Sequence, residues 1–176
     1  MEDKNALQNE IHAWHRRNYP NDDHYSALMG IQEEIGELNR AELKQEGGIR
    51  GTYEEWEMEK QKEVGDVLIG ILNFAGYRSI PITKALDATS MYMSTTKDTK
   101  LVLLLISVAF GKLVDNALSG LAQRTPWFVG SLYRDVEAYC YVAGYDPAKL
   151  LAARWDTISK RDFIKNPLTG GRENEK

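Results

Sequence analysis

The chain has 176 residues, which is enough for one domain with a sizeable hydrophobic core. Hydrophobic residues make up 43% and charged residues 27%, so the composition excludes fibrous and disordered classes. A net charge of -4 provides no basic surplus for a nucleic-acid backbone, and we expect no nucleic-acid partner. The single cysteine, Cys140, excludes an internal disulfide and a cysteine-based zinc site.

Neither a secretory signal nor a membrane span is predicted. The first residues, MEDKNALQNE, are polar and acidic. The most apolar run, LVLLLISVAF at 101–110, is much shorter than the roughly 20 residues that span a bilayer. We therefore expect a cytoplasmic protein without a membrane partner.

Apolar residues recur with helical spacing along most of the chain, and no stretch of useful length alternates with the period of a strand. Ser26 is the expected N-cap of the second helix, Gly47-Gly48 its end, and Pro147 the first residue of the last helix. The predicted helices cover 5–18, 26–45, 53–76, 82–92, 101–118, 131–144 and 147–160. We expect one all-α domain, a helical bundle over residues 1–165, followed by a mobile tail at 166–176.

Two helical segments resemble each other. The segments 31–43 and 106–118 share four identities, Ile31/Ile106, Gly36/Gly111, Leu38/Leu113 and Leu43/Leu118. The segments 74–86 and 142–153 also share an Ala-Gly-Tyr helix end. These matches are consistent with a degenerate internal duplication, although unrelated helices also match by chance. In the second copy Val108, Ala109 and Lys112 replace three acids of the first.

Those three acids lie in the stretch QEEIGEL at 32–38. At about 100° per residue, Glu34 falls at the edge of the apolar stripe of its helix. Glu37 lies further round the helix from this stripe, and Glu33 points toward solvent. Gly30, one turn before Glu34, leaves room for a ligand to approach.

The helix predicted at 53–76 places Glu63, Asp66 and Asn73 on one face, and almost every other position from Val67 onward is apolar. Burying an unpaired carboxylate costs several kcal/mol, so Asp66 needs a counter-charge. Lys62 is the nearest candidate in sequence, in the weaker i,i+4 orientation. A basic residue from another segment and a metal ion are the stronger alternatives.

The pairs Glu34/Glu37 and Glu63/Asp66 share i,i+3 spacing, which puts each pair on one helix face. If the two helices pack together, four carboxylates meet and need a cation between them. All-oxygen ligation suits Mg²⁺, or Mn²⁺ as its substitute, and Mg²⁺ on carboxylates commonly binds phosphates.

At this point the chain resembles the MazG-like, all-α nucleoside triphosphate pyrophosphohydrolases, whose motif is E-E-x-x-E followed by E-x-x-D. Here EEIGE (33–37) is followed by 25 residues and then EVGD (63–66). The clear resemblance covers roughly residues 7 to 78, including HAWHRRNYP, and AGYDPAKLLAARWDTISKR resembles the closing helix of the family.

The resemblance implies Mg²⁺-dependent hydrolysis of a (d)NTP to (d)NMP and pyrophosphate. By position, Glu34, Glu37, Glu63 and Asp66 would ligate Mg²⁺, and Glu33 would be an outer ligand or would orient the attacking water. The stretch 91–129 is longer than the minimal family pattern, so the oligomeric state and the substrate pocket stay open. We expect a homodimer or a larger homo-oligomer.

Further residues are candidates for substrate contacts, and each has a structural alternative. Asn73 would contact the sugar or base, or bond to a neighbouring helix. Arg154, Lys160 and Arg161 would contact the phosphates, and Trp56 would stack on a base. Arg17, beside Trp14, would form part of a nucleotide pocket. Surface or packing roles are the alternatives for these residues. His12, His15 and His24 form no ligand pattern.

Two other functions remain open. The acids would form salt bridges with Lys44, Lys60 or Lys62 in a non-catalytic, partner-binding helical protein. Alternatively, the same metal site would serve a phosphatase or a nuclease.

Overall fold

The computed structural model describes residues 3–89 and 96–170. In these two ranges the chain forms seven α-helices, a short 3₁₀ helix (Ala122–Arg124) and no strand, which confirms the predicted all-α class. The α-helices are α1 (Lys4–Asn18), α2 (His24–Gly47), α3 (Tyr53–Tyr77), α4 (Ile82–Asp87), α5 (Thr99–Leu118), α6 (Thr125–Ala143) and α7 (Pro147–Ser159).

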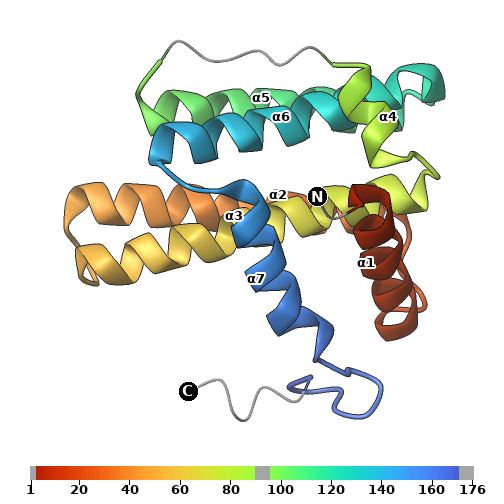
Figure 1. Cartoon of the computed structure of the whole chain (residues 1–176), viewed down its shortest axis with the longest axis horizontal. Coiled ribbons are helices and arrows are strands. Elements are labelled where there is room, and N and C mark those ends of the chain that lie inside the picture. Colours follow the sequence, from red (N-terminus) through yellow and green to blue (C-terminus); the bar gives the residue numbers. More distant parts are fainter. Residues whose placement is uncertain (1–2, 90–95, 171–176) are drawn as a thin grey trace.

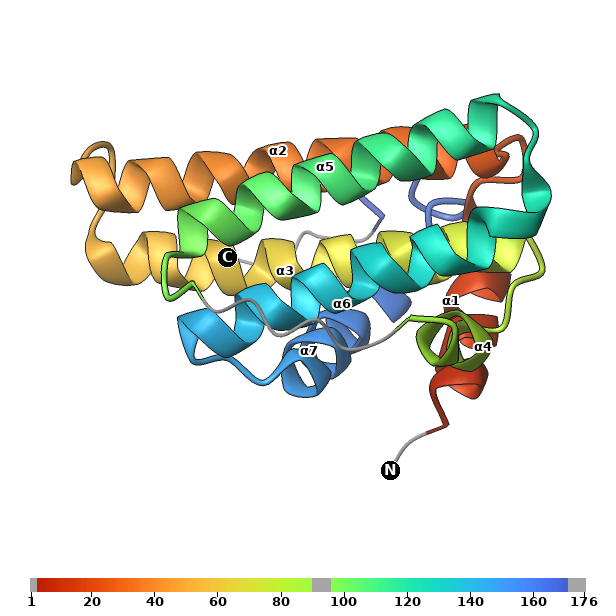
Figure 2. The same cartoon turned by 90° about the horizontal axis from the view of Figure 1, so that it is seen from above.

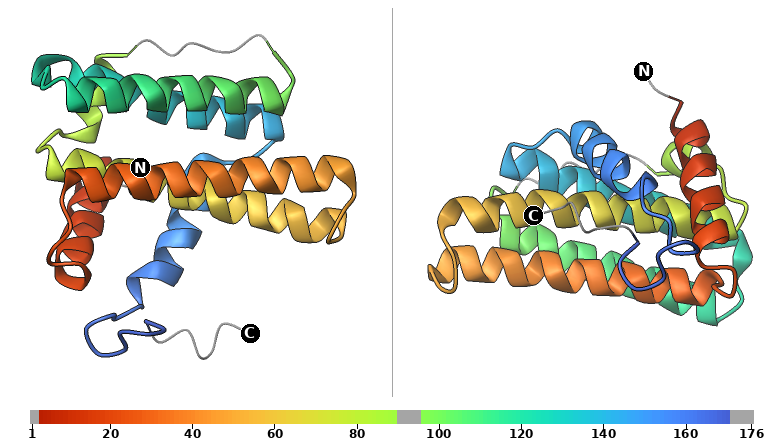
Figure 3. Two further views of the ribbon diagram at one scale, coloured as in Figure 1. Left: turned by 180° about the vertical axis from the view of Figure 1, so that it is seen from behind. Right: turned by 90° about the horizontal axis from the view of Figure 1, so that it is seen from below.

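Two antiparallel helical hairpins form the body of the protein. The first hairpin, α2 with α3, lies in one layer and the second, α5 with α6, in the layer above it (Figure 1). Seen from above, α2 runs beside α5 and α3 beside α6 (Figure 2). Helices α1 and α7 pack on α3 and extend away from the second hairpin, as the left view of Figure 3 shows, whereas α4 packs on α6.

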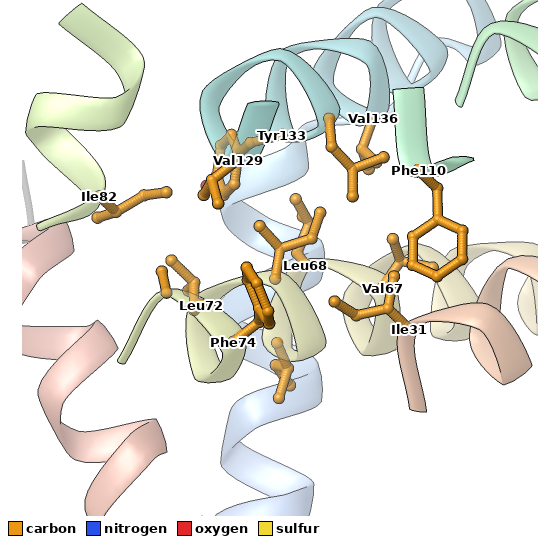
Figure 4. Packing of buried hydrophobic residues seen from close by; sticks show 14 of the residues in the cluster. Ile31, Val67, Leu68, Leu72, Phe74, Ile82, Phe110, Val129, Tyr133 and Val136 are labelled. Carbon is orange, nitrogen blue, oxygen red and sulfur yellow. The ribbon is translucent and has the colours of Figure 1, made fainter. Parts of the chain in front are cut away.

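Helix α3 is the centre of the core. From Glu63 to Ala75 only Gly70 is partly exposed, because α3 contacts α1, α2, α6 and α7. Figure 4 shows Leu68 and Leu72 of α3 directed toward Val129 and Val136 of α6. Full burial of each such side chain contributes about 1.5–3 kcal/mol, so this contact holds the two hairpins together.

Several helix ends differ from the sequence prediction. The N-cap of α2 is Asp23, whose carboxylate accepts hydrogen bonds from the Tyr25 and Ser26 amides, so the prediction of Ser26 was wrong. Ser26 completes the capping box instead. Helix α6 begins earlier than predicted, at Thr125, because Pro126 suits a first helical turn.

Helix α4 ends at Asp87, and residues 90–92 of the longer helix predicted there lie outside the described residues. The start of α7 at Pro147 is confirmed, with Asp146 as its N-cap.

The first residues of the predicted tail form hydrogen-bonded turns. The Gly170 amide donates to the Asn166 carbonyl at 2.7 Å, and the Asp162 amide donates to the Gly170 carbonyl at 3.1 Å. Gly170 has a φ of 62°, and a Cβ there would approach the Phe163 ring to 2.7 Å, so both conformation and space favour glycine. Residues 171–176 lie outside the described residues.

The positions that match between the two similar segments occupy equivalent places in the two hairpins. Ile31 and Ile106 are fully buried, as are Leu38 and Leu113, whereas Leu43 and Leu118 are exposed. The short helix after α3 packs on α6, and the helix after α6 packs on α3. The hairpins are thus equivalent in packing, and the duplication itself stays a prediction.

The contact between α4 and α6 depends on Gly130, where an added Cβ would lie 2.1 Å from the Ala85 carbonyl oxygen. We predict that Gly130→Ala lowers the free energy of unfolding by about 1–3 kcal/mol, because the backbones must move apart. Chemical denaturation measures this change. Gly36→Ala is the matched control: it lies on an exposed helix face with open space, and it should raise stability by up to about 1 kcal/mol. Equal effects at both positions would contradict the prediction.

Candidate metal centre

Three of the predicted acids meet between α2 and α3. Glu34, Glu37 and Glu63 each place one carboxylate oxygen within 4.8 Å of the other two. The i,i+3 spacing puts Glu34 and Glu37 on the same face of α2, and the antiparallel packing of the hairpin brings Glu63 opposite them. As predicted, Glu33 is exposed, and Glu34 and Glu37 lie at the margin of the core.

Glu63 is the most buried member of this acidic cluster. Its Oε1 accepts a hydrogen bond from Lys62 Nζ at 2.5 Å. Its Oε2 is buried, and no N–H or hydroxyl group of the described residues donates to it. The carboxyl groups of Glu34 and Glu59 lie within hydrogen-bonding reach of Glu63. Since a carboxylate only accepts, such contacts require a proton or a cation between the groups.

The pKa values in the cluster reflect this crowding. Burial, together with bonding to Glu34 and Glu59, raises the pKa of Glu63 to about 9 against the opposing effect of the Lys62 ammonium. Burial also raises the pKa of Glu34 to about 7, and the negative charge of Asp66 adds to this rise. Protons therefore occupy the cluster near neutral pH, in the place where a divalent cation would replace them.

Asp66 is held apart from the cluster by an ion pair. The guanidinium of Arg154, on α7, donates from Nε to Asp66 Oδ1 at 2.7 Å, and both side chains are largely buried. The counter-charge of Asp66 is thus a basic residue from another segment, one of the two stronger alternatives. The structure brings together three of the four predicted ligands and leaves the fourth paired with arginine.

Gly65 explains how α7 comes close enough for this pair to form. A Cβ at Gly65 would lie 2.6 Å from Cβ of Arg154 and 3.2 Å from the carbonyl oxygen of Leu150. The glycine in the EVGD motif therefore permits the close packing of α7 on α3, which carries Arg154 to Asp66.

A half-enclosed cavity of about 300 Å³ adjoins the acidic cluster. Helices α1, α2, α3 and α7 line it, together with the segment that follows α7. Its lining includes acids (Asp22, Glu33, Glu34 and Asp66), aromatic rings (Trp14, Tyr19 and Phe163) and two arginines (Arg154 and Arg161). Its volume is at the lower end of the range for ligand sites.

Asn73 lines the same cavity, and its Oδ1 lies 3.1 Å from His12 Nδ1 on α1. The proposed alternative for Asn73, a bond to a neighbouring helix, is therefore observed, and the residue also faces the cavity. His15 contributes to the lining as well. Burial lowers the pKa of His15, and its buried Nδ1 receives no hydrogen bond from the described residues.

Three other residues predicted to contact the substrate lie outside the cavity. Lys160 is exposed and pairs with Asp156 at 2.7 Å. Trp56 donates from Nε1 to the Ile49 carbonyl at 3.1 Å, in the turn between α2 and α3. Arg17 is exposed, and none of these three residues lines the cavity.

Sequence reasoning missed Tyr19 and Phe163 and considered Trp14 only as a neighbour of Arg17. Trp14 donates from Nε1 to the Arg161 carbonyl at 3.1 Å and contacts the Tyr19 and Phe163 rings edge to face. The aromatic residues of HAWHRRNYP were the available signal, but only folding brings Phe163 beside them.

Two lysines of the partner-binding alternative, Lys60 and Lys62, pair with different acids. Lys62 pairs with Glu59 at 3.1 Å and with Glu63 at 2.5 Å, so it does reach a motif acid. Lys60 is buried and pairs instead with Glu42 at 3.3 Å and Glu57 at 3.1 Å, outside the two motifs.

Glu37 has a weaker partner in Arg40, at 3.7 Å and largely exposed, where solvent screens the attraction. Lys62 and the solvent-screened Arg40 are two bases beside the three acids of the cluster, so the acids outnumber the bases.

No protein-family model, curated protein or solved structure matches this chain. The fold and site define an all-helical protein with a buried acidic cluster beside a cavity lined by aromatic rings and arginines.

The raised pKa values predict how stability depends on pH. The folded state holds protons on Glu34 and Glu63 that the unfolded chain releases near pH 4.5, so metal-free stability should fall as pH rises toward 9. Mg²⁺ should raise the Tm more at pH 8.5 than at pH 6, because it binds the deprotonated cluster. Thermal unfolding with and without Mg²⁺ measures both effects, at about 2–4 °C per kcal/mol for a chain of this size.

Glu63→Gln is the control for this titration. The amide cannot ionise, so the stability of the metal-free protein should fall less steeply as pH rises. The increase in Tm that Mg²⁺ causes should also become smaller. An equal Mg²⁺ effect at both pH values, or one that Glu63→Gln leaves unchanged, would refute the interpretation.

Proposed function

We propose that the protein is a Mg²⁺-dependent nucleoside triphosphate pyrophosphohydrolase of the MazG-like type, which cleaves a (d)NTP to (d)NMP and pyrophosphate. The observation that carries this proposal is the buried Glu63 Oε2, which lacks a hydrogen-bond donor among the described residues and belongs to a three-carboxylate cluster beside a cavity. A structural acidic cluster would be expected to satisfy such an atom with a base or an amide.

The donor set fits a hard cation. Glu34, Glu37 and Glu63 offer only carboxylate oxygens, which suit Mg²⁺ and also Mn²⁺. When bound, Mg²⁺ would neutralise phosphate charge and activate a water molecule for attack on phosphorus. Asp66 stays in the proposed ligand set, but it must first exchange its partner Arg154.

The chain's own residues would then bind and orient the triphosphate. Arg154 and Arg161 line the cavity, and a guanidinium binds phosphate oxygens in a bidentate manner. If Arg154 moves to a phosphate, it frees Asp66 without leaving a buried charge unpaired. Glu33, which is exposed and lines the cavity, would orient the attacking water.

The aromatic part of the cavity would receive the base and sugar. The rings of Trp14, Tyr19 and Phe163 offer stacking surfaces, and Asn73 offers a side-chain amide for a polar contact. Gly30 leaves this space open, since an added Cβ would meet nothing within 4 Å. We restrict the proposed substrate contacts to cavity residues, which excludes Arg17, Lys160 and Trp56.

The proposal predicts pyrophosphate and a nucleoside monophosphate as products when a panel of NTPs and dNTPs is incubated with Mg²⁺. Glu63→Gln should lower kcat/KM at least about a hundredfold, because it removes a charged ligand from the centre. Glu46→Gln is the matched control: the same change on the exposed end of α2, where Glu46 pairs only with Lys100 among the ion pairs of the described residues. Product analysis by phosphate-specific assay and chromatography provides the readout.

Each alternative function predicts a different outcome of the product analysis. Orthophosphate would indicate a phosphatase, and cleaved oligonucleotide would indicate a nuclease. No turnover of any nucleotide with Mg²⁺ or Mn²⁺ would favour the partner-binding protein.

Filling the cavity provides a second test. Gly30→Leu should raise the KM for the preferred nucleotide by roughly 5- to 100-fold, because loss of base stacking costs about 1–3 kcal/mol. Gly36→Leu is the control, since Gly36 lies on the same helix, also has open space and does not line the cavity. Steady-state kinetics of the two variants measures the difference. An unchanged KM for Gly30→Leu would exclude this cavity as the binding site.

A further inference from the structure

Helix α5 presents an apolar stripe to solvent. Leu101, Leu104, Leu105 and Val108 are all exposed, and their spacing of i, i+3, i+4 and i+7 places them on one helix face. The sequence carries no charged residue between Lys100 and Lys112. Isolated exposed leucines need no explanation, but a continuous stripe of this kind marks a contact surface.

The equivalent face of the first hairpin has a different character. The match of Ile31 with Ile106 aligns the stripe with Ser26, Met29, Gly30 and Glu33 of α2. On α2, Ser26, Gly30 and Glu33 line the cavity that α1 and α7 help to enclose, and Met29 is exposed on the same helix face. On α5 large aliphatic residues replace three of the four positions. The second hairpin therefore keeps the packing of the first and carries an apolar face in place of its cavity face.

A transmembrane role does not fit this helix. Residues Thr99–Leu118 are long and apolar enough to span a bilayer, but 44% of that stretch is buried inside the protein. The buried side packs on α2 and α6 with Ile106 and Leu113 completely covered. Only one stripe of α5 is thus available for contact, as for a helix that packs against another helix.

The charges at the two ends of the stripe indicate the occupant. Lys97, Asp98 and Lys100 stand before its first leucine, and Lys112 and Asp115 follow its last valine. The Lys100 ammonium pairs with Glu46 of α2 at 2.6 Å. Apart from Lys100, which Glu46 neutralises, each end carries one positive and one negative group, so the stripe lacks the basic border that attracts a helix to anionic lipid. In an antiparallel pair of such helices, the charges at one end meet the complementary charges at the other.

We propose that the α5 stripe is a homodimer interface in which α5 packs antiparallel against α5 of a second copy, about a two-fold axis near Leu105. This arrangement places Lys97 opposite Asp115 of the second copy and Asp98 opposite Lys112. Each pair forms twice because the interface is isologous. Within one chain, Lys97 precedes α5 and Asp115 lies near its other end, and the helix from Thr99 to Asp115 is about 24 Å long, so the two residues cannot pair intramolecularly.

None of the stripe residues lines the cavity beside the acidic cluster. Dimerisation through α5 therefore leaves that cavity accessible and is independent of the proposed enzymatic activity.

Sedimentation velocity of the full chain across a concentration series tests the proposal, with the mass of two chains expected at high concentration. Leu104→Glu should weaken dimerisation at least about tenfold, because it places a carboxylate in the apolar centre. Leu43→Glu is the matched control, since Leu43 is 62% exposed and Leu104 is 63% exposed. The control variant should retain the dissociation constant of the unchanged chain.

A charge exchange then tests the antiparallel geometry. Lys97→Asp should weaken the dimer, because two aspartates would face each other, and adding Asp115→Lys in the same chain should restore it. A monomer at every concentration, or a dimer indifferent to Leu104→Glu, overturns the proposal. The proposal is also overturned if the double variant dimerises no more tightly than Lys97→Asp alone. A monomer that floats with phosphatidylserine vesicles, and loses this with Leu104→Glu, would assign the stripe to membrane adsorption instead.

Discussion

The main physical constraint on the candidate site is the burial of the Glu63 carboxyl group in α3, the most enclosed helix among the described residues. A buried carboxylate costs several kcal/mol unless its charge is compensated. Lys62 compensates one oxygen, whereas the remaining neighbours are the acids Glu34 and Glu59, and the pKa of Glu63 is raised to about 9 as a result. The folded chain thus maintains an unfavourable concentration of acids, which the apolar packing around α3 must offset. Such local cost at an otherwise well-packed position is typical of functional sites.

Helix α3 serves both the core and the candidate site. Its apolar faces join the first hairpin to the second, while Glu63 and Asp66 face α2 and α7. A buried polar network supports the same arrangement, since the Tyr139 hydroxyl on α6 donates to Glu42 of α2 at 2.8 Å. Glu42 also pairs with Lys60 of α3 at 3.3 Å. Packing and polar contacts therefore fix the position of α3 together, and the cluster inherits its geometry from both.

The two hairpins show how one packing scheme supports two kinds of surface. Residues at matched core positions, such as Leu38 and Leu113, are equally buried, so the bundle interior constrains them alike. The outer faces are free of that constraint. One face bears Glu33 beside a cavity, and the equivalent position of the other bears the exposed Val108. We infer that the first hairpin carries the chemistry and the second the contact with another copy of the chain.

The sequence by itself determined the helical class, most helix positions and the side of α2 on which Glu34 and Glu37 lie, because these follow from local spacing along a helix. It also identified Asp66 as a residue in need of a partner. Only the tertiary structure decided that this partner is Arg154, that Asp66 stands apart from the other three acids, and that Phe163 joins Trp14 at the cavity. These features depend on the approach of α7 to α3 at Gly65 and on the path of the chain after α7. Periodicity within one helix specifies which face is buried, but carries no information about which distant segment covers it.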